Sequence, residues 1–276
     1  MMVEPGPASM SSLPDLPASE RPWFHEAFDH AYNELYAHRD EDEARQCVDL
    51  MERLWSQHAT DRGGRQGPLL DLCCGAGRHS AQARARGFCV VSLDLSTDLL
   101  QSGVERDAEL LAVRADMRVL PFADGAFAGM LNFFTSFGYF SSDEENLDTA
   151  IEMARVIEPG GLLLWDHINP DWLRSHLVAE SRRQIAGGIW ALERRRIDPE
   201  SRRVEKTIEL HTPGDGPAGQ HELVRRYRES VRLYSPLHAV SLFHRAGFDV
   251  LERLGDYQAG SFTAASPRQI LLLRRR

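Results

Sequence analysis

Cysteine and long hydrophobic runs are both scarce in this sequence. The four cysteines, Cys47, Cys73, Cys74 and Cys89, are not spaced as Cys-x-x-Cys, so we expect buried, reduced thiols rather than disulfides or zinc ligands. The 11 histidines show no metal-ligand spacing, and no metal site is predicted. No apolar run approaches the roughly 18 to 20 residues of a membrane span, and residues 1–21 do not resemble a secretory signal. We therefore expect a cytoplasmic protein without membrane contact, whose residues 1–21 form a disordered tail.

Positive charge is also limited, because 41 acidic residues outnumber 32 basic ones and give a net charge of -9. This balance argues against a general nucleic-acid binder. The basic residues gather between positions 182 and 245, where 13 of them accompany 8 acidic residues. An anionic substrate or an acidic partner surface would explain this local excess.

The middle of the chain alternates short apolar runs with amphipathic segments, which is typical of a parallel sheet covered by helices on both faces. Two helices, at 23–36 and 42–57, are predicted before it. Ser96 is placed to cap one of the later helices. The predicted strands are 69–73, 88–93, 110–113, 127–133 and 161–165, and the predicted helices between them are 80–86, 97–106 and 144–157.

After Pro170 the pattern changes to alternation of polar and apolar residues, as in antiparallel strands with one solvated face. This applies to 189–197, 203–211 and 223–233, with a mobile turn at 212–219. A helix at 237–246 and strands at 248–254 and 269–273 then complete the sheet. The predicted fold is a doubly wound, mostly parallel seven-stranded α/β sheet with a small antiparallel insertion after strand five. The predicted divisions are a tail (1–21), a helical lid (22–62), a core (63–178), the insertion (179–234) and the end of the core sheet (235–276).

Residues suited to ligand binding, among them three aspartates, follow three successive predicted strands. Asp71 precedes a loop with Gly75 and Gly77, and glycines at a strand-to-helix turn allow close backbone approach to a ligand. Asp94 ends the next strand, where a carboxylate can accept hydrogen bonds from a ribose diol. Asp116 and Met117 end the third, where they can bind an adenine amino group and ring face. Each feature alone also fits a plain βα turn or a helix cap.

Taken together, these residues resemble the class I S-adenosylmethionine (SAM)-dependent methyltransferases. The resemblance rests on Asp-x-x-Cys-Gly-x-Gly at 71–77, on Asp94, on Asp116-Met117 and on Glu-Pro-Gly-Gly at 158–161, and it covers residues 23–170. Gly-Arg-His-Ser at 77–80 and the aromatic run at 132–140 are similar to a bacterial subgroup that acts mostly on small molecules. The resemblance implies a Rossmann-like methyltransferase fold, SAM as cofactor and S-adenosylhomocysteine as product.

The resemblance also implies roles for individual residues. Asp71, Gly75 and Gly77 would line the methionine part of SAM, although Arg78 stands where a third glycine is often found. The other implied cofactor contacts are Asp94 and Leu95 at the ribose, Asp116 and Met117 at the adenine, Asn132 and Phe133 at the sulfonium, and Tyr32 and Tyr36 in an N-terminal lid. For the tyrosines, simple packing in the helix is the alternative.

The residues that would contact the methyl acceptor are less clearly indicated by the sequence. His167 is the first candidate for a general base or a substrate contact, and Tyr139 is the second. A structural hydrogen bond to the crossover loop is the alternative for His167. Phe137 is a candidate substrate contact on the aromatic loop. Arg226 and Arg228 flank Tyr227 and can hold a carboxylate or phosphate, unless they lie on a solvated strand face.

The predicted activity is transfer of the SAM methyl group to an O or N atom of a small, possibly anionic molecule in specialised metabolism. The insertion would cover the active site or form a homodimer contact. Rival hypotheses are a nicotinamide-dependent oxidoreductase, for which Ser80 stands in place of a third glycine, a methyltransferase acting on RNA or protein through the basic insertion, and a SAM-binding sensor without activity.

Overall fold

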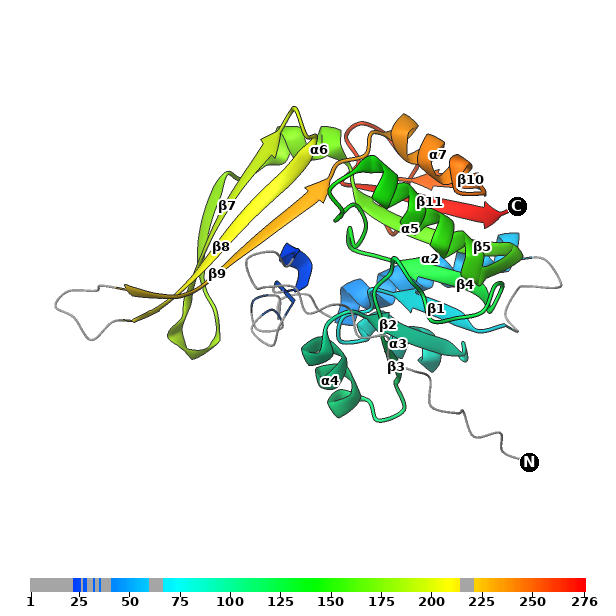
Figure 1. Cartoon of the computed structure of the whole chain (residues 1–276), viewed down its shortest axis with the longest axis horizontal. Helices are drawn as coiled ribbons and strands as arrows, with labels where there is room; N and C mark the ends of the chain where they lie inside the picture. Colours follow the sequence, from blue (N-terminus) through cyan, green and yellow to red (C-terminus); the bar gives the residue numbers. More distant parts are fainter. Residues whose placement is uncertain are drawn as a thin grey trace.

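The computed structural model describes residues 22–25, 27–28, 32, 35, 41–59, 67–213 and 221–276. The predicted tail, Tyr36 and most of the predicted turn at 212–219 lie outside the described residues. Two sheets form the framework, one with seven strands and one with four (Figure 1).

The seven-stranded sheet has the order β10-β11-β5-β4-β1-β2-β3, in which β11 runs antiparallel to both of its neighbours. Its first strand in the chain, β1, lies near the middle, so the strand order reverses there. The strands are β1 (Leu69–Leu72), β2 (Val90–Asp94), β3 (Leu111–Arg114), β4 (Phe127–Asn132), β5 (Ile157–Ile168), β10 (Phe248–Leu254) and β11 (Arg268–Arg275). The predicted fold, a mostly parallel sheet of seven strands, is confirmed.

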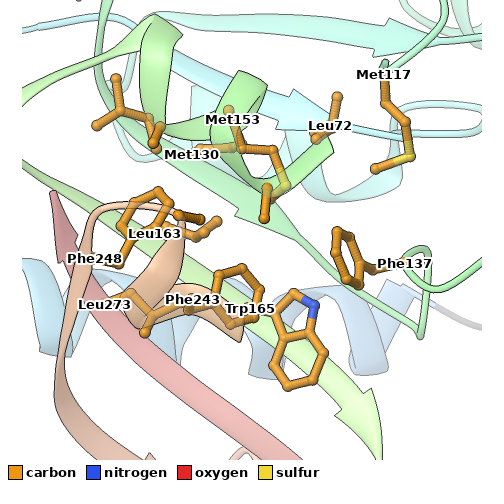
Figure 2. Close-up of a cluster of buried hydrophobic side chains, with 14 of the residues drawn as sticks. Leu72, Met117, Met130, Phe137, Met153, Leu163, Trp165, Phe243, Phe248 and Leu273 are labelled. Atoms are coloured by element: carbon orange, nitrogen blue, oxygen red, sulfur yellow. The ribbon is translucent and has the colours of Figure 1, made fainter. Parts of the chain in front are cut away.

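Helices cover both faces of this sheet because its central strands are apolar on both sides. On one face α2 (Glu41–His58) buries Met51, Leu54 and Trp55 against Leu131 and its neighbours. On the other face α5 (Asp143–Val156) and α7 (Pro236–Arg245) pack in a second cluster around Trp165 and Phe243 (Figure 2). The remaining helices are α3 (Arg78–Ala85), α4 (Thr97–Arg106), which Ser96 caps as predicted, and α6 (Pro170–His176).

The inserted sheet consists of β6 (Glu180–Gln184), β7 (Trp190–Asp198), β8 (Arg203–Pro213) and β9 (His221–Arg232), all antiparallel. A short 3-10 segment, η3 (Ala186–Gly188), joins the first two. The insertion is confirmed as a separate antiparallel sheet, and it extends away from the core in Figure 1. The alternation of polar and apolar residues did not predict β6, because every residue of this strand is polar or charged, as its sequence ESRRQ shows.

The N-terminal segment differs from the single helix predicted over 23–36. It starts with a 3-10 turn, η2 (Trp23–His25), and the chain bends at Ala27 and Phe28. Ala27 and Leu35 are buried against Ala191, Ile208 and other residues of the inserted sheet. Tyr32 and Leu35, farther along the segment, are helical, so the described residues depart from the prediction at the start of the segment.

Two further expectations need correction. All four thiols are free, but Cys89 is exposed rather than buried, because it precedes β2 and does not lie within it. The segment Glu158-Pro-Gly-Gly161 was expected to separate a helix from a strand. It belongs instead to β5, which starts at Ile157 and is irregular in its pairing with β4 at this point.

Candidate active site

A cavity of about 710 Å³ lies beyond the carboxyl ends of β1, β2, β3 and β4. In an open α/β sheet this is the crevice where ligands bind, next to the point where the strand order reverses. Residues from all four strand ends line it, together with the loop after β4 and the described part of the N-terminal segment. The cavity is therefore formed by the core, and the N-terminal segment covers it.

The turn from β1 to α3 forms one wall of the cavity. Gly75 and Gly77 both have left-handed backbone conformations, with φ of +56° and +71°. A Cβ atom at Gly77 would lie 2.9 Å from Leu110 Cδ1, so a larger residue would strain the backbone and would also require the Leu110 side chain to shift. The turn brings the Gly75 amide to Asp94, where its N–H donates to Oδ2 at 2.8 Å. Gly75 lines the cavity, whereas Gly77 supports the turn from behind.

Asp71 lies at the end of β1 and is almost fully buried. The Ser80 hydroxyl donates to its Oδ2 at 2.6 Å, and the Ser92 hydroxyl donates to Ser80 Oγ at 2.7 Å. Burial raises the pKa of Asp71 to about 6, and the hydrogen bond from Ser80 opposes this shift. The carboxyl group is thus ionised at neutral pH, and the serine pair fixes the side on which it can accept further hydrogen bonds.

Asp94 ends β2 and is held from both sides by backbone amides. Gly75 N–H donates to one carboxylate oxygen at 2.8 Å and Ser96 N–H to the other at 2.9 Å. Burial raises the pKa of Asp94, while these amides lower it. Each oxygen keeps a lone pair for another donor, so the carboxylate can accept two hydrogen bonds from a diol in the cavity.

The third strand supplies Asp116 and Met117. The guanidinium of Arg118 binds both oxygens of Asp116, with Nη2 2.7 Å from Oδ2, and this hydrogen bonding raises the pKa of Arg118. The Arg118 guanidinium also lies 5.0 Å from the centre of the Phe140 ring. The Met117 sulfur accepts a weak hydrogen bond from the Cys73 thiol at 3.8 Å. Both predicted adenine contacts line the cavity.

The loop after β4 has an unusual backbone, since Phe134 and Thr135 are non-glycine residues with φ of +57° and +64°. Asp166 in β5 holds this conformation: its Oδ2 accepts the Phe134 amide at 2.8 Å and its carbonyl accepts the Thr135 amide at 3.1 Å. Asp166 is in turn bound by Arg268, at 2.7 Å from each carboxylate oxygen, and by the Tyr257 hydroxyl at 2.8 Å. An ion pair whose carboxylate is fully buried therefore supports the loop that lines this side of the cavity.

Aromatic rings form the far end of the cavity. Tyr139 lies with its ring centre 4.8 Å from that of Trp23 and 6.0 Å from that of Phe28. Phe28 in turn makes an edge contact with Tyr32 at 4.9 Å. Burial raises the pKa of Tyr139 well above that of a free tyrosine. Tyr139 therefore remains a neutral phenol and can donate a hydrogen bond, but it is a poor general base.

Most of the predicted cofactor contacts meet in this one cavity. Those that line it are Tyr32, Asp71, Gly75, Asp94, Leu95, Asp116, Met117 and Phe133, joined by Tyr139 from the acceptor side. Asn132 does not line it, because it is fully buried and its Nδ2 donates to the Leu72 carbonyl at 3.2 Å. Phe137 is also buried in the core, beside Trp165 and Phe243.

His167 does not line the cavity, and its position does not support a role as general base. β5 continues to Ile168 and pairs with β11, so His167 lies inside the sheet, opposite Gln269. Its ring is fully buried and stacks on Trp165 at 5.0 Å, and its Nδ1 lies 3.0 Å from the Ile168 carbonyl. Burial lowers the pKa of His167 to about 4. The structural alternative for this residue was a hydrogen bond to the crossover loop, whereas the observed partner, Ile168, belongs to β5 itself.

Arg226 and Arg228 are also absent from the cavity lining. Strand alternation places both on the face of the inserted sheet opposite Tyr227, and Tyr227 packs against the N-terminal segment. Arg226 binds Glu209 through Nε at 2.9 Å and Nη2 at 2.6 Å. The solvated strand face, the alternative interpretation of this pair, therefore applies.

Several lining residues were not predicted. They are Phe24, Phe28, Glu41, Cys73, Cys74, Ala76, Arg78, His79, Leu99, Ser102, Arg106, Ala115, Phe134, Ser136 and Phe140. His79 stands within the glycine motif itself, and its ring lies 4.8 Å from that of Phe133. Its position directly after Gly77-Arg78 could have indicated a place in the wall. The contributions of Glu41 and Arg106 depend on tertiary packing, for which the sequence has no local signal.

Comparison with known proteins identifies the core of the chain. Residues 69–161 match the model of a family described as a methyltransferase domain. This segment holds the strand ends that bear Asp71, Asp94 and Asp116, and the sequence resemblance to methyltransferases is confirmed for it.

Two relatives illustrate the range of similarity. A demethylmenaquinone methyltransferase of Beutenbergia cavernae is 38% identical over 129 residues, which are 44% of this chain and 50% of the relative. The chain thus spans only about half the length of that relative. A dTDP-3-amino-3,4,6-trideoxy-alpha-D-glucopyranose N,N-dimethyltransferase of Streptomyces venezuelae is 26% identical over 249 residues, which are 87% of this chain and 90% of the relative.

A solved structure shares most of the architecture. The methyltransferase CcbJ of Streptomyces caelestis superposes with a TM-score of 0.69 at 19% identity, and the match covers 85% of this chain and 95% of that one. The fold, including more than the methyltransferase domain alone, is therefore common to the two proteins.

Proposed function

We propose that this protein is a SAM-dependent methyltransferase that transfers the methyl group of SAM to a nitrogen or oxygen atom of a small molecule. The observation that carries the proposal is that Asp71, Asp94 and Asp116, from three successive strand ends, all line one cavity. SAM presents an amino group, a ribose diol and an adenine amino group, and each of these donors needs an acceptor. The three carboxylates supply acceptors in that order along the sheet.

The residues present fit this cofactor. Asp94 would hold the ribose hydroxyls through the lone pairs that the Gly75 and Ser96 amides leave open. Asp71 would accept from the methionine amino group, and Met117 would lie on the adenine. When bound, SAM supplies an electrophilic methyl group on its sulfonium. The protein then has to hold the acceptor in line with that group and exclude water.

The two residues predicted as bases and one relative favour a nitrogen acceptor, although the imidazole of His79 also lines the cavity. A neutral amine attacks with its own lone pair, whereas an alcohol must lose a proton to a base. Neither residue predicted as a base is suited to that role, because Tyr139 has a raised pKa and His167 lies outside the lining. The Streptomyces relative that matches along most of the chain is named for N,N-dimethylation of an amino sugar, which supports the same choice.

The rival hypotheses receive less support. In the nicotinamide alternative a third glycine would stand at Ser80, but this residue is buried and binds Asp71. For a nucleic-acid or protein substrate, the insertion should present unpaired basic groups. Four of its arginines instead bind carboxylates of the same sheet: Arg194, Arg195, Arg196 and Arg226. A homodimer contact through the insertion stays a prediction that analytical ultracentrifugation can test.

The cellular location also stays a prediction. Within the described ranges, none of the helices is both long and apolar enough to cross a membrane. We propose a cytoplasmic enzyme, as expected for a protein whose cofactor is made and recycled there.

Calorimetric titration with SAM and with NAD tests the cofactor. We expect SAM to bind, and Asp94→Ala to raise its dissociation constant about 5- to 150-fold, the effect of losing about 1 to 3 kcal/mol of hydrogen bonding. Asp148→Ala is the matched control, since Asp148 is an exposed carboxylate on α5 outside the cavity. Binding of NAD without SAM, or equal SAM affinity in both variants, would refute the assignment.

The acceptor is tested by release of S-adenosylhomocysteine with a panel of small molecules. The panel contains an amino sugar linked to dTDP, glycine, sarcosine and the hydroxyl analogue of each amine. We expect turnover with an amine and none with its hydroxyl analogue. SAM binding with turnover only on hydroxyl compounds would contradict the nitrogen preference and leave the cofactor assignment intact.

A further inference from the structure

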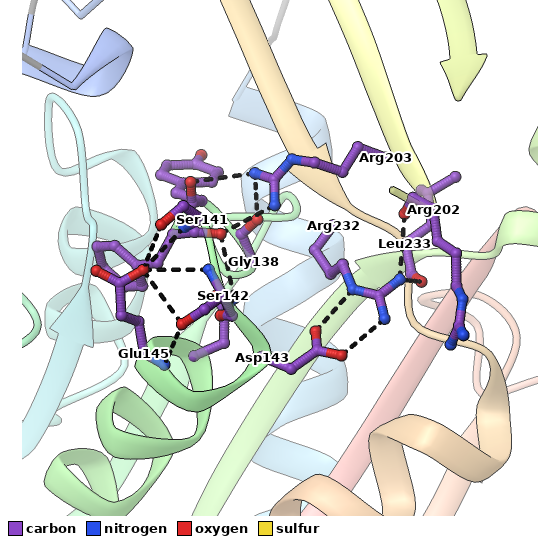
Figure 3. A network of polar contacts seen from close by, with 12 residues as sticks. Gly138, Ser141, Ser142, Asp143, Glu145, Arg202, Arg203, Arg232 and Leu233 are labelled. Atoms are coloured by element: carbon purple, nitrogen blue, oxygen red, sulfur yellow. Dashed lines mark hydrogen bonds and ion pairs between the residues drawn. The ribbon is translucent and has the colours of Figure 1, made fainter. Parts of the chain in front are cut away.

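The side chain of an arginine in the inserted sheet reaches the wall of the cavity. Arg203, the first residue of β8, reaches across to the loop that follows β4 (Figure 3). Its Nη1 donates to the Phe140 carbonyl at 2.9 Å, and its Nη2 lies 3.1 Å from each of the carbonyls of Gly138 and Tyr139. Three consecutive carbonyl groups of the loop therefore share one guanidinium.

Arg203 is itself held in place by β9. Its Nε donates to the Ser230 hydroxyl at 2.7 Å and its Nη2 to the Ser230 carbonyl at 2.7 Å. The planar guanidinium carries five N–H donors in a fixed arrangement, and here they are divided between Ser230 and the loop. The inserted sheet therefore sets the orientation of the Arg203 guanidinium, and through it the position of the three loop carbonyls.

The loop that Arg203 holds carries cavity-lining rings. Tyr139 and Phe140 both line the cavity, and Tyr139 also packs on Trp23 and Phe28 of the N-terminal segment. Gly138, directly before them, has φ of +90° and lies so close to β9 that an added Cβ would be 3.0 Å from the Arg232 carbonyl oxygen. The backbone at these positions cannot shift without breaking the contacts of Arg203.

An ion pair also joins the inserted sheet to the core, but it binds a different part of the core. The Arg232 side chain, at the end of β9, binds Asp143 at the start of α5, with distances of 2.8 and 3.0 Å (Figure 3). Its further hydrogen bonds go to the carbonyls of Arg202 and Leu233, so its guanidinium does not contact residues 138–140. The Arg232 backbone N–H does hold the loop, since it donates to the Gly138 carbonyl at 2.8 Å. The Arg232 guanidinium, in contrast, attaches the sheet to α5 without a hydrogen bond to residues 138–140.

We propose that Arg203 is a positioning residue for the acceptor end of the cavity, acting through the backbone of residues 138–140 to fix the ring of Tyr139. The inserted sheet then determines the shape of the acceptor site from outside it, although none of its own residues lines the described cavity. This inference rests on the proposed function only in naming that end of the cavity as the acceptor end. The geometric claim, that Arg203 sets the Tyr139 ring, stands without any ligand.

The test uses the full-length protein labelled with 3-fluorotyrosine and observed by fluorine NMR, with the Tyr139 resonance assigned from Tyr139→Phe. We expect Arg203→Met to shift and broaden the Tyr139 resonance. Arg203→Lys should produce a smaller change of the same kind, since one ammonium cannot reach three carbonyls and Ser230 at once. Arg232→Met is the matched control: it removes the ion pair that joins β9 to α5 but keeps the backbone hydrogen bond from Arg232 to Gly138, so it should leave the Tyr139 resonance in place.

The possible outcomes test the positioning role of Arg203 separately from the proposed methyltransferase activity. An unchanged Tyr139 resonance in Arg203→Met, or an equal change in Arg232→Met, would overturn the positioning role and indicate simple attachment. If Arg203→Met does not fold, Arg203→Lys and Ser230→Ala give the same comparison with smaller perturbations. Failure of SAM to bind, with the Tyr139 shift present, would refute the proposed function and leave the role of Arg203 standing.

Discussion

The buried ion pair between Asp166 and Arg268 should make Arg268 one of the residues most sensitive to substitution. Asp166 is fully buried, and the Arg268 side chain is 20% exposed. Arg268→Met keeps the length of the side chain but removes the two hydrogen bonds to Asp166 and the one to Thr135 Oγ1 at 3.1 Å. The carboxylate would then remain in the interior without a cationic partner.

The expected cost can be estimated from the surroundings of Asp166. Removing one partner of a buried pair costs about 3 to 5 kcal/mol, because a buried charge is left uncompensated. In the variant the Tyr257 hydroxyl and the Phe134 amide still donate to Oδ2, each at 2.8 Å. We therefore expect the lower end, about 3 kcal/mol. For a protein of this size that lowers Tm by roughly 6 to 12 °C.

Urea unfolding followed by circular dichroism measures this loss. Arg174→Met is the control, because the Arg174–Asp171 pair is more than half exposed on both sides and should contribute at most about 1 kcal/mol. In Asp166→Asn/Arg268→Met no uncompensated charge remains, so we expect part of the lost stability to return. A loss below about 1 kcal/mol in Arg268→Met would refute the reasoning, as would a double variant no more stable than the single one.

Two further predictions concern the wall of the cavity. The pKa of Asp71 is raised from 3.8 to about 6, so its contribution to stability is full below pH 4 and is lost as the pH rises through 6. The stability of the wild type relative to Asp71→Asn should fall by up to about 3 kcal/mol between pH 4 and 7, and a pH-independent difference in urea unfolding would contradict this. Gly77→Ala should destabilise more than Gly87→Ala, since both positions have positive φ but only Gly77 is crowded; equal losses would show that crowding by Leu110 is unimportant.

Much of the core fold could be predicted from the sequence because its signals are local. A central parallel strand must be apolar on both faces, so runs such as 127–133 show where the strands lie. Carboxylates at strand ends meet at one edge whatever the details of the loops, and for this reason Asp71, Asp94 and Asp116 could be grouped in advance. The cap at Ser96 likewise depends only on its immediate neighbours.

Which residues lie near the methyl acceptor could not be predicted from the sequence, because this depends on the tertiary structure. His167 follows a strand and looked exposed at its end, but pairing with β11 extends β5 past it and buries the ring. Arg226 and Arg228 looked available beside Tyr227, yet the direction in which Tyr227 packs decides that they face the other way. No sequence motif indicated Arg203, because the carbonyl groups that it binds lie about 63 to 65 residues away in the chain.

The sequence by itself therefore determined the sheet, its glycine turn and the carboxylates along its edge, since these follow from local patterns and the geometry of parallel strands. Only the tertiary structure decided which side chains face the acceptor, because that depends on how the inserted sheet and the N-terminal segment pack over the cavity.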